Sequence, residues 1–207
     1  MPVNPTEILI YHITDVMNLP GILKVGGLKS DCMMVNQHHA PIGYTHIKQR
    51  RMTEIRVPCR NNRFVGEFVP FYYCPRSPML YVVNQGTTGR PAGCQNSILH
   101  LVSTVAIGMA QDGDWTVSDG NAGSAYSSFY DDLEAGFAAI DWKAVRATDW
   151  RAVTNQKSAE FLVADFFPWS GIQIIGCHDS GVAEQVRGLL NKQAHQPAVQ
   201  VQTGWYY

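Results

Sequence analysis

Glu160 stands where a polar stretch of the chain runs into an apolar one. The residues from Asn155 onward are polar or small, and residues 161–163 form an apolar run of strand length. This pattern predicts a loop that enters a buried strand, with the carboxylate of Glu160 fixed at the start of that strand. A carboxylate held there can stabilise an oxocarbenium-like centre and bind a sugar hydroxyl as a glycosidic bond ionises. Taken alone, such a glutamate is more often a solvated residue that precedes a strand.

His12 lies in a second stretch that could hold a ligand. Residues 8–13 are apolar and largely β-branched, and they predict a buried strand whose end carries His12, Ile13 and Thr14. Asp15 can cap a helix that follows, and a pair of glycines ends that helix. Backbone groups between a strand end and a helix start commonly bind small ligands. A single histidine in an apolar strand is more often a core residue.

Arg51 belongs to a basic segment. Residues 46–63 contain six cationic side chains but only one acidic residue, Glu54. The cationic residues are Lys48, Arg50, Arg51, Arg56, Arg60 and Arg63. The spacing over residues 42–54 predicts a helix that carries Arg51, and the aperiodic residues 29–41 predict a loop that can fold over a ligand. A basic face can bind phosphates even in a chain of net charge −1. A solvated helix surface explains the same charges equally well.

Two further segments suit contact with nucleic acid. Residues 70–81 combine four aromatic rings, prolines and an arginine, and Ser77-Pro78 predicts a helix start. Rings of this kind stack on bases, and a helix start holds a phosphate, although a core strand that ends at a helix cap needs some of the same residues. Residues 119–155 show no firm pattern beyond one short helix near 131–140, which is typical of a substrate-recognition loop.

The composition describes one ordinary globular domain over residues 1–207, with 45% hydrophobic and 16% charged residues. The first residues lack the pattern of a signal peptide, and no apolar run is long enough to span a membrane. Five scattered cysteines without a Cys-x-x-Cys pair predict a reduced, cytoplasmic protein. Cys32, His38, His39 and Cys59 fit no familiar zinc spacing, so we expect no metal.

Short strands with few helices predict an α+β fold with a split, largely antiparallel sheet. Further strands are expected at 55–57, 63–69, 98–105, 115–117 and 172–177, with a helix over 181–192 and an edge strand at 197–202.

Three stretches together resemble the DarT family of DNA ADP-ribosyltransferase toxins: residues 11–14 (Tyr-His-Ile-Thr), residues 70–81 and residues 159–163 (Ala-Glu-Phe-Leu-Val). The resemblance extends over nearly the whole chain. It implies an ADP-ribosyltransferase fold with flanking helices, NAD as donor, and transfer of ADP-ribose to a base in single-stranded DNA. It also implies a toxin–antitoxin system with a DarG-type macrodomain antitoxin that removes the modification.

The same resemblance implies roles for individual residues. Arg51 and Glu160 correspond to the catalytic pair. The predicted NAD-binding residues are His12, Ile13, Thr14, Gly21, Leu28, Lys29 and Arg51, with residues 35–53 closing over NAD. The predicted DNA-binding residues are Pro75, Arg76, Ser77, Pro78, Met79, Leu80, Val145, Arg146, Ala147, Thr148, Arg151, Ala152, Val153 and Thr154. Residues 119–160 correspond to the loop that selects the target, and the Arg51 type of site implies thymidine, where relatives modify guanosine.

The chemistry limits what the pair can do. Glu160 can stabilise the positive ribose that forms when nicotinamide leaves. Because a guanidinium stays protonated in proteins, we expect Arg51 to stabilise the developing thymine anion and the NAD phosphates, while Glu160 or water takes the proton.

Two other functions remain compatible with the sequence. One is a non-catalytic module that binds single-stranded nucleic acid, as the basic and aromatic segments allow. The other is an ADP-ribosyltransferase that acts on protein or RNA, which would differ mainly in residues 119–160.

Overall fold

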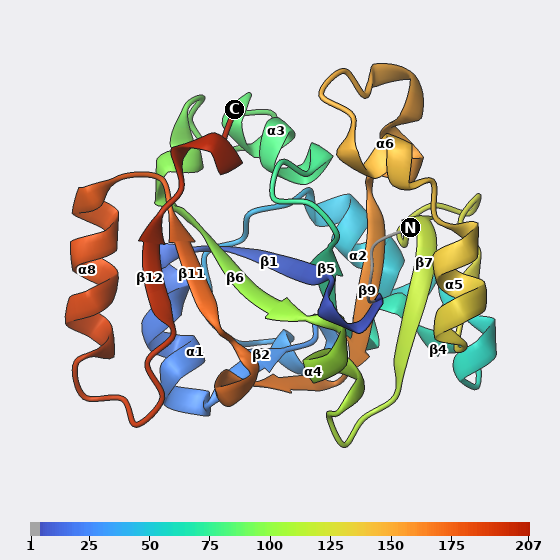
Figure 1. The fold of residues 1–207 in the computed structure, drawn as a ribbon, viewed down its shortest axis with the longest axis horizontal. Helices are drawn as coiled ribbons and strands as arrows, with labels where there is room; N and C mark the ends of the chain where they lie inside the picture. The colour runs from blue at the N-terminus through green and yellow to red at the C-terminus, as the bar shows by residue number, and fades with distance from the viewer. Residues whose placement is uncertain (1–4) are drawn as a thin grey trace.

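The computed structural model describes residues 5–207, and its centre is an eight-stranded sheet in the order β12-β11-β6-β1-β5-β9-β7-β8 (Figure 1). Its strands are β1 (Leu9–Asp15), β5 (Phe68–Tyr72), β6 (Ile98–Thr104), β7 (Trp115–Asn121), β8 (Phe129–Tyr130), β9 (Ala159–Ala164), β11 (Ile174–Cys177) and β12 (Ala198–Val201). Neighbouring strands are antiparallel except β11 and β12, which are parallel.

Two small antiparallel sheets accompany the large one. The first pairs β2 (Gly27–Lys29) with β10 (Phe166–Pro168), and the second pairs β3 (Arg56–Val57) with β4 (Arg63–Phe64). The fold is therefore α+β, with strands divided among one large and two small sheets, and the predicted fold class is confirmed.

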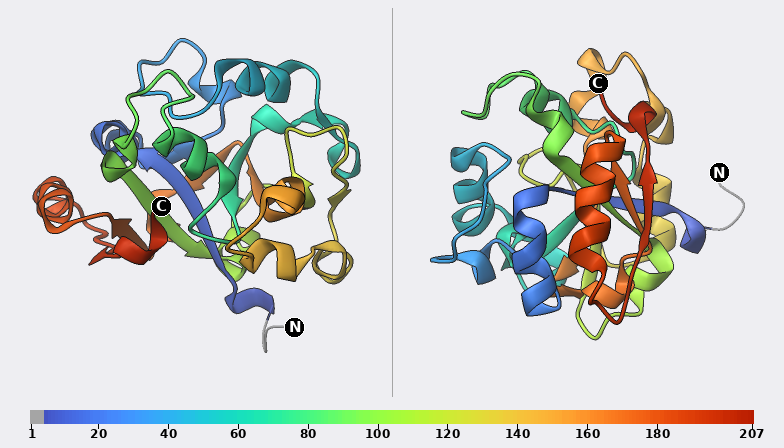
Figure 2. Two further views of the ribbon diagram at one scale, coloured as in Figure 1. Left: turned by 90° about the horizontal axis from the view of Figure 1, so that it is seen from above. Right: turned by 90° about the vertical axis from the view of Figure 1, so that its left-hand side faces the viewer.

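Helices flank the sheets, as the two further views show (Figure 2). They are α1 (Leu19–Val25), α2 (Thr45–Thr53), α3 (Pro78–Asn84), α4 (Val105–Met109), α5 (Leu133–Ala139), α6 (Trp142–Arg146), α7 (Thr154–Lys157) and α8 (Ser180–Leu190). Helix α8 lies beside β12 at one end of the large sheet, and α5 lies beside β7 near the other (Figure 1). None of the helices within residues 5–207 has the length and apolar character needed to cross a membrane.

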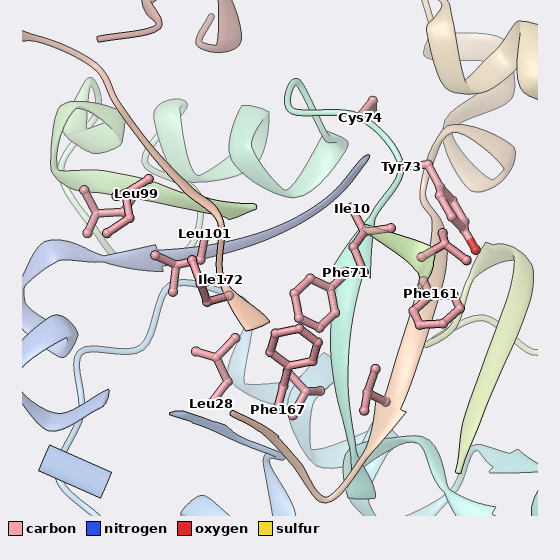
Figure 3. Packing of buried hydrophobic residues seen from close by; sticks show 14 of the residues in the cluster. Ile10, Leu28, Phe71, Tyr73, Cys74, Leu99, Leu101, Phe161, Phe167 and Ile172 are labelled. Atoms are coloured by element: carbon pink, nitrogen blue, oxygen red, sulfur yellow. The ribbon is translucent and has the colours of Figure 1, made fainter. Parts of the chain in front are cut away.

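Part of the main hydrophobic core lies between the large sheet and the β2–β10 pair. Phe71 on β5 packs against Phe167 on β10 with ring centroids 4.8 Å apart, and Ile10, Leu28 and Phe161 surround them (Figure 3). These side chains alternate along their strands with residues that face the other side, so each strand presents one apolar row to this core. The packing fixes β5 and β9 side by side.

Capping and turn residues in the sequence predicted the ends of several of these elements correctly. Asp15 caps a 3₁₀ turn (Val16–Asn18) that leads into α1, and Gly26 ends α1 with a left-handed φ of 79°. Ser77 caps α3 by accepting a hydrogen bond from the backbone N–H of Leu80. Asn61 and Asn62 both have positive φ, as the predicted turn requires.

Residues 119–155 contain more structure than their sequence indicated. Strand β7 runs on to Asn121, and β8, α6 and α7 follow in addition to the predicted helix, which is α5. Helix α6 is only five residues long and is defined by its cap, where the Asp141 carboxylate accepts hydrogen bonds from two backbone N–H groups. An element of this length has no measurable periodicity, so pattern alone does not find it.

His100 on β6 supports the segment that leads into α3. Its Nε2–H donates to the carbonyl oxygen of Pro75 over 2.9 Å, inside a shell formed by Tyr11, Trp205 and Tyr206. Burial lowers the pKa of His100 to about 4, and the hydrogen bond to Pro75 offsets this only in part. The ring is therefore neutral at neutral pH.

We expect His100 to make folding stability depend on pH. Its folded pKa lies below that of the unfolded chain, so the unfolded state binds the proton first as pH falls from about 6.5 towards 4. The free energy of unfolding should fall over this window by about 3 kcal/mol, at about 1.4 kcal/mol per pKa unit. Urea unfolding between pH 4 and 7.5 measures this free energy. Its dependence on pH should become weaker in His100→Gln and should be unchanged in the exposed control His38→Gln. The same pH dependence in the wild type and both variants would contradict the assignment.

Candidate active site

Arg51 and Glu160 form a buried ion pair between α2 and β9. Nη1 of Arg51 lies 3.1 Å from Oε1 of Glu160, and Nη2 lies 2.9 Å from Oε2, so the guanidinium holds both carboxylate oxygens. Glu160 is 0% exposed and Arg51 is 9% exposed. The structure thus brings together the two residues predicted to form the catalytic pair, although 109 positions separate them.

The position of Arg51 depends on a close approach of α2 to the 3₁₀ turn Val65–Glu67. A Cβ atom on Gly66 would lie 2.6 Å from Cγ and 2.8 Å from Cα of Met52, the neighbour of Arg51. Only glycine allows α2 to lie this close. Gly66 therefore helps to set the depth at which Arg51 enters the protein.

Glu160 is positioned by the strands on both sides of β9. It pairs with Tyr72 on β5 and with Ser118 on β7, whose hydroxyl accepts a hydrogen bond from the Glu160 backbone N–H over 3.1 Å. The register of β7 shifts between Ser118 and Asn121. Just beyond this irregularity the backbone N–H of Ala122 donates to Oε1 of Glu160 over 3.0 Å, so the bulge re-aims a donor at the carboxylate.

None of these three neighbours, Tyr72, Ser118 and Ala122, was anticipated from the sequence. The signal for Tyr72 was its place in the aromatic run 70–81, but pairing with Glu160 depends on strand register. Ala122 contributes through its backbone, which no residue type reveals. Burial and then the Glu160 charge raise the pKa of Tyr72 above its ordinary value, so its hydroxyl keeps its proton.

The electrostatics of the pair decide the charge on Arg51. Burial lowers the pKa of the guanidinium, but the charge of Glu160 and the hydrogen bonds to it act the other way and dominate, so the pKa lies above its ordinary value. Arg51 therefore remains a cation throughout the physiological range. A fixed cation can stabilise an anion but cannot accept a proton.

His12 lies in β1, and its ring is already engaged on one side. Nδ1 lies 2.9 Å from the carbonyl oxygen of Pro70 and therefore carries the hydrogen, which leaves Nε2 as the free ring nitrogen. Burial lowers the pKa of His12, so the ring is neutral at neutral pH. The contact with Pro70 therefore gives one side of the ring a structural role in the fold.

Polar contacts attach the loop before α2 to the end of β1. Asn18 donates to Thr14 Oγ1 over 3.1 Å and to the carbonyl oxygen of Ala40 over 2.9 Å, and it accepts from the Ala40 N–H over 2.7 Å. Arg90 pairs with Asp15 and also donates to Pro41. Asn18 and Arg90 therefore hold Ala40 and Pro41 against the end of β1, and neither was singled out from the sequence.

The other predicted NAD-binding residues differ in how exposed they are. Ile13 and Leu28 are buried in apolar clusters, whereas Gly21 on α1 is exposed. Lys29 on β2 is half-buried, and its ammonium donates to Gln37 over 3.4 Å, which links β2 to the loop.

The predicted DNA-binding segments meet around a cavity of about 280 Å³. Its lining residues come from 73–76, 145–148, Trp150, Lys157 and Tyr207. Arg76, Arg146 and Thr148 are exposed, whereas Ser77, Pro78, Leu80 and Val145 are buried and offer a ligand at most their backbone. Met79 is half-buried.

Residues 151–154 lie outside the cavity lining, in a 3₁₀ turn (Arg151–Val153) and the start of α7. Arg151, Ala152 and Thr154 are exposed and Val153 is half-buried. Arg151 pairs with the exposed Asp149 over 2.9 Å.

The basic segment is paired within the protein. Lys48 contacts Asp31, Arg50 contacts Glu54, Arg60 lies near Asp114 and Asp131, and Arg63 contacts Glu67 and Asp165. Arg56 donates to the Asn62 carbonyl and lies over the Phe64 ring. Arg51 is thus distinct among the six because its partner, Glu160, lies inside the site.

Within residues 5–207 no three His, Cys, Asp or Glu side chains gather as a metal site. All five cysteines are free thiols.

Comparison with known proteins gives a consistent assignment. The family described as "ssDNA thymidine ADP-ribosyltransferase, DarT" matches residues 11–207. A DNA ADP-ribosyl transferase of Thermus aquaticus is 39% identical over 98% of this chain and 90% of its own length.

Solved structures agree. Thermus sp. 2.9 DarT in complex with ADP-ribosylated ssDNA superimposes with a TM-score of 0.90 at 35% identity, covering 98% of both chains. The same enzyme in complex with NAD+ gives a TM-score of 0.86 at 32% identity, covering 99% of this chain and 100% of that one. The resemblance seen in the sequence is thereby confirmed: the chain belongs to the DarT family of single-stranded DNA thymidine ADP-ribosyltransferases.

Proposed function

We propose that this NAD-dependent DNA ADP-ribosyltransferase uses Glu160 and Arg51 as its catalytic pair to transfer ADP-ribose to a thymidine base in a preferred DNA sequence. The observation that carries the proposal is the buried, two-point contact between the Arg51 guanidinium and the Glu160 carboxylate. Thermus sp. 2.9 DarT, solved with NAD+ and with ADP-ribosylated ssDNA, supports the donor and the acceptor. His12 and Thr14 would hold NAD beneath residues 35–53.

The hydrogen-bond capacity of Glu160 suits this role. A carboxylate offers about four acceptor positions, and the contacts from Arg51 and Ala122 use three, two on Oε1 and one on Oε2. The remaining position on Oε2 can accept a ribose hydroxyl. As the bond between the ribose C1′ and nicotinamide breaks, nicotinamide leaves with the electron pair, and the fixed negative charge of Glu160 stabilises the positive ribose.

Arg51 has capacity left as well. Two of its five N–H groups hold Glu160, and three remain for the NAD phosphates or for the thymine oxygens. Thymine N3 forms the new bond to C1′ and loses its proton. Because the pKa of Arg51 is raised, that proton passes to Glu160 or to water and not to the guanidinium.

Family membership also suggests a setting for the reaction. We infer that a DarG-type macrodomain antitoxin reverses the modification and that the protein acts as a toxin in the cytoplasm, where DNA and NAD meet. The free cysteines are compatible with that reducing compartment.

We expect a DNA oligonucleotide incubated with this protein and NAD to gain the mass of one ADP-ribose per modified base. Single strands whose only candidate acceptor is thymidine or guanosine, matched RNA strands and bacterial lysate protein are tested side by side by mass spectrometry. A mass gain only on strands that contain thymidine as the acceptor supports the proposal. Gain on guanosine, RNA or protein would reassign the acceptor, and binding without any mass gain would favour a non-catalytic binding module.

Glu160→Gln should lower the rate of transfer by about three orders of magnitude or more, because it removes the charge that stabilises the positive ribose. Single-turnover kinetics with saturating NAD and DNA measure the loss, and circular dichroism checks the fold. The matched control is Glu67→Gln, which alters another carboxylate paired with an arginine, 2.9 Å from Arg63. A loss of less than tenfold in Glu160→Gln would exclude the proposed role.

Arg51→Lys should lower kcat/KM by about a hundredfold, of the order found when one preorganised donor is lost. Lysine keeps the positive charge but cannot hold both oxygens of Glu160 with a planar group. The control Arg63→Lys changes an arginine that also contacts two carboxylates, Glu67 and Asp165, outside the site. Unchanged kcat/KM in Arg51→Lys would show that charge alone suffices.

A further inference from the structure

Three aromatic side chains from distant parts of the chain meet beside the predicted DNA-binding segments. Tyr81 on α3 lies 5.3 Å from Trp150 and 5.2 Å from Tyr207, measured between ring centroids, and Trp150 lies 6.4 Å from Tyr207. Tyr81 is 37% exposed, and the other two rings are half-buried. In Figure 1 the chain end after β12 lies above the sheet with α3, on the side where α6 also lies.

Tyr207 connects this aromatic cluster to Arg76. The Arg76 guanidinium lies over the Tyr207 ring, 4.6 Å from its centroid, and the Tyr207 hydroxyl donates to the Arg76 carbonyl over 2.9 Å. Gln95 holds the Tyr207 backbone by accepting its N–H over 2.9 Å. The ring is therefore held in one orientation, with an exposed cation beside it.

The cavity of about 280 Å³ adjoins this cluster and includes Arg76, Trp150 and Tyr207 in its lining. Its volume lies just below the range for small-ligand pockets, which begins at about 300 Å³, so it suits no more than a single planar ring system with its sugar. None of the described residues that line it is acidic, whereas Arg76, Arg146 and Lys157 are cationic. The lining thus favours an aromatic group attached to a phosphate.

Lys157 fixes the opposite wall. Its side chain is almost fully buried, and the ammonium donates to the carbonyl oxygens of Val145 and Ala147 over 3.0 and 2.9 Å. These bonds hold residues 145–147 in place at one side of the cavity. Lys157 also precedes Glu160 by only three residues, so the wall is attached to the strand that carries Glu160.

The cavity lies close to the site in the fold. Tyr73, which lines the cavity, directly follows Tyr72, the strand partner of Glu160. Tyr73 belongs to the main core cluster, whereas Tyr72 packs against the cluster that contains Ile13 and Leu80, so the two side chains leave the backbone in different directions. The chain therefore passes directly from the strand partner of Glu160 to the wall of the cavity.

We propose that the cavity is a subsite for a base next to the reacting thymidine, and that Tyr207 is the ring on which this base stacks. The inference rests on the proposed function and adds to it a residue that determines sequence preference. Arg76, held over the same ring, contacts the adjoining phosphate. The base lies between Tyr207 and the wall held by Lys157, and the protein recognises it by its shape and its stacking on the ring.

The test measures binding of single-stranded oligonucleotides by fluorescence anisotropy without NAD, so that it does not depend on transfer. A series of strands carries one abasic sugar at each position around the thymidine. Tyr207→Ala should weaken binding of the intact strand by between about fivefold and a hundredfold, the range for loss of one stacking ring. Tyr207→Phe should stay within about threefold, because it keeps the ring.

The abasic series identifies the base. At one position next to the thymidine, the abasic sugar should weaken binding to the wild type but not to Tyr207→Ala, because both changes remove the same contact. Phe64→Ala is the matched control, since it removes a ring under another arginine, with Arg56 4.0 Å from its centroid. It should respond to the abasic series as the wild type does.

Two results would overturn the inference. One is unchanged affinity of Tyr207→Ala for the intact strand. The other is additive losses at every abasic position, which would mean that Tyr207 contacts none of these bases. Failure of the wild type to modify DNA would instead count against the proposed function, and the binding results would still decide the role of Tyr207.

Discussion

A buried ion pair between Arg51 and Glu160 is the interaction around which the structure is arranged. Removing two charges from water is unfavourable, and the loss is offset only when geometry is good and the remaining polar groups are paired. Here the guanidinium meets both carboxylate oxygens, and the Ala122 N–H supplies a third contact. The pair keeps Arg51 cationic beside the Glu160 carboxylate in a place that water reaches poorly, where charges act most strongly on a reacting bond.

Several structural features serve that pair. Gly66 admits α2 close to the 3₁₀ turn beside it, the bulge in β7 presents Ala122, and strand register puts Tyr72 beside Glu160. On the other side, Asn18 and Arg90 hold the loop before α2 against the end of β1. The two proposed catalytic side chains thus come from a helix and a strand, while the loop before α2 is held by a few polar contacts. Regular elements position side chains more rigidly than a loop does.

The segments predicted to bind DNA lie beside other side chains that hold their backbone in place. His100 supports Pro75, Lys157 supports residues 145–147, and Tyr207 supports Arg76. In each case a buried or half-buried side chain bonds to a backbone carbonyl of a segment that also carries exposed side chains. The exposed segments therefore have defined positions although they contain little regular structure.

Features encoded by neighbouring residues could be predicted from the sequence. The strand over residues 8–13, the caps at Asp15 and Ser77 and the turn at Asn61 depend on local propensity, and each agrees with the structure. The resemblance to DarT also came from short runs of adjacent residues, and it named Arg51 and Glu160 correctly as a spatial pair. Short elements such as α6 carry no periodic signal and were not predicted.

Other features depend on the order and register of the strands, which no local pattern records. The basic segment could have formed an open phosphate-binding face, but folding pairs most of its cations with acidic side chains and leaves Arg51 opposite Glu160. Tyr207 reaches Arg76 only because the end of the chain packs beside α3. The sequence by itself determined the local elements and the residue types available for chemistry. The tertiary structure decided which of those residues meet, because contacts over a hundred positions apart arise only when the whole sheet has assembled.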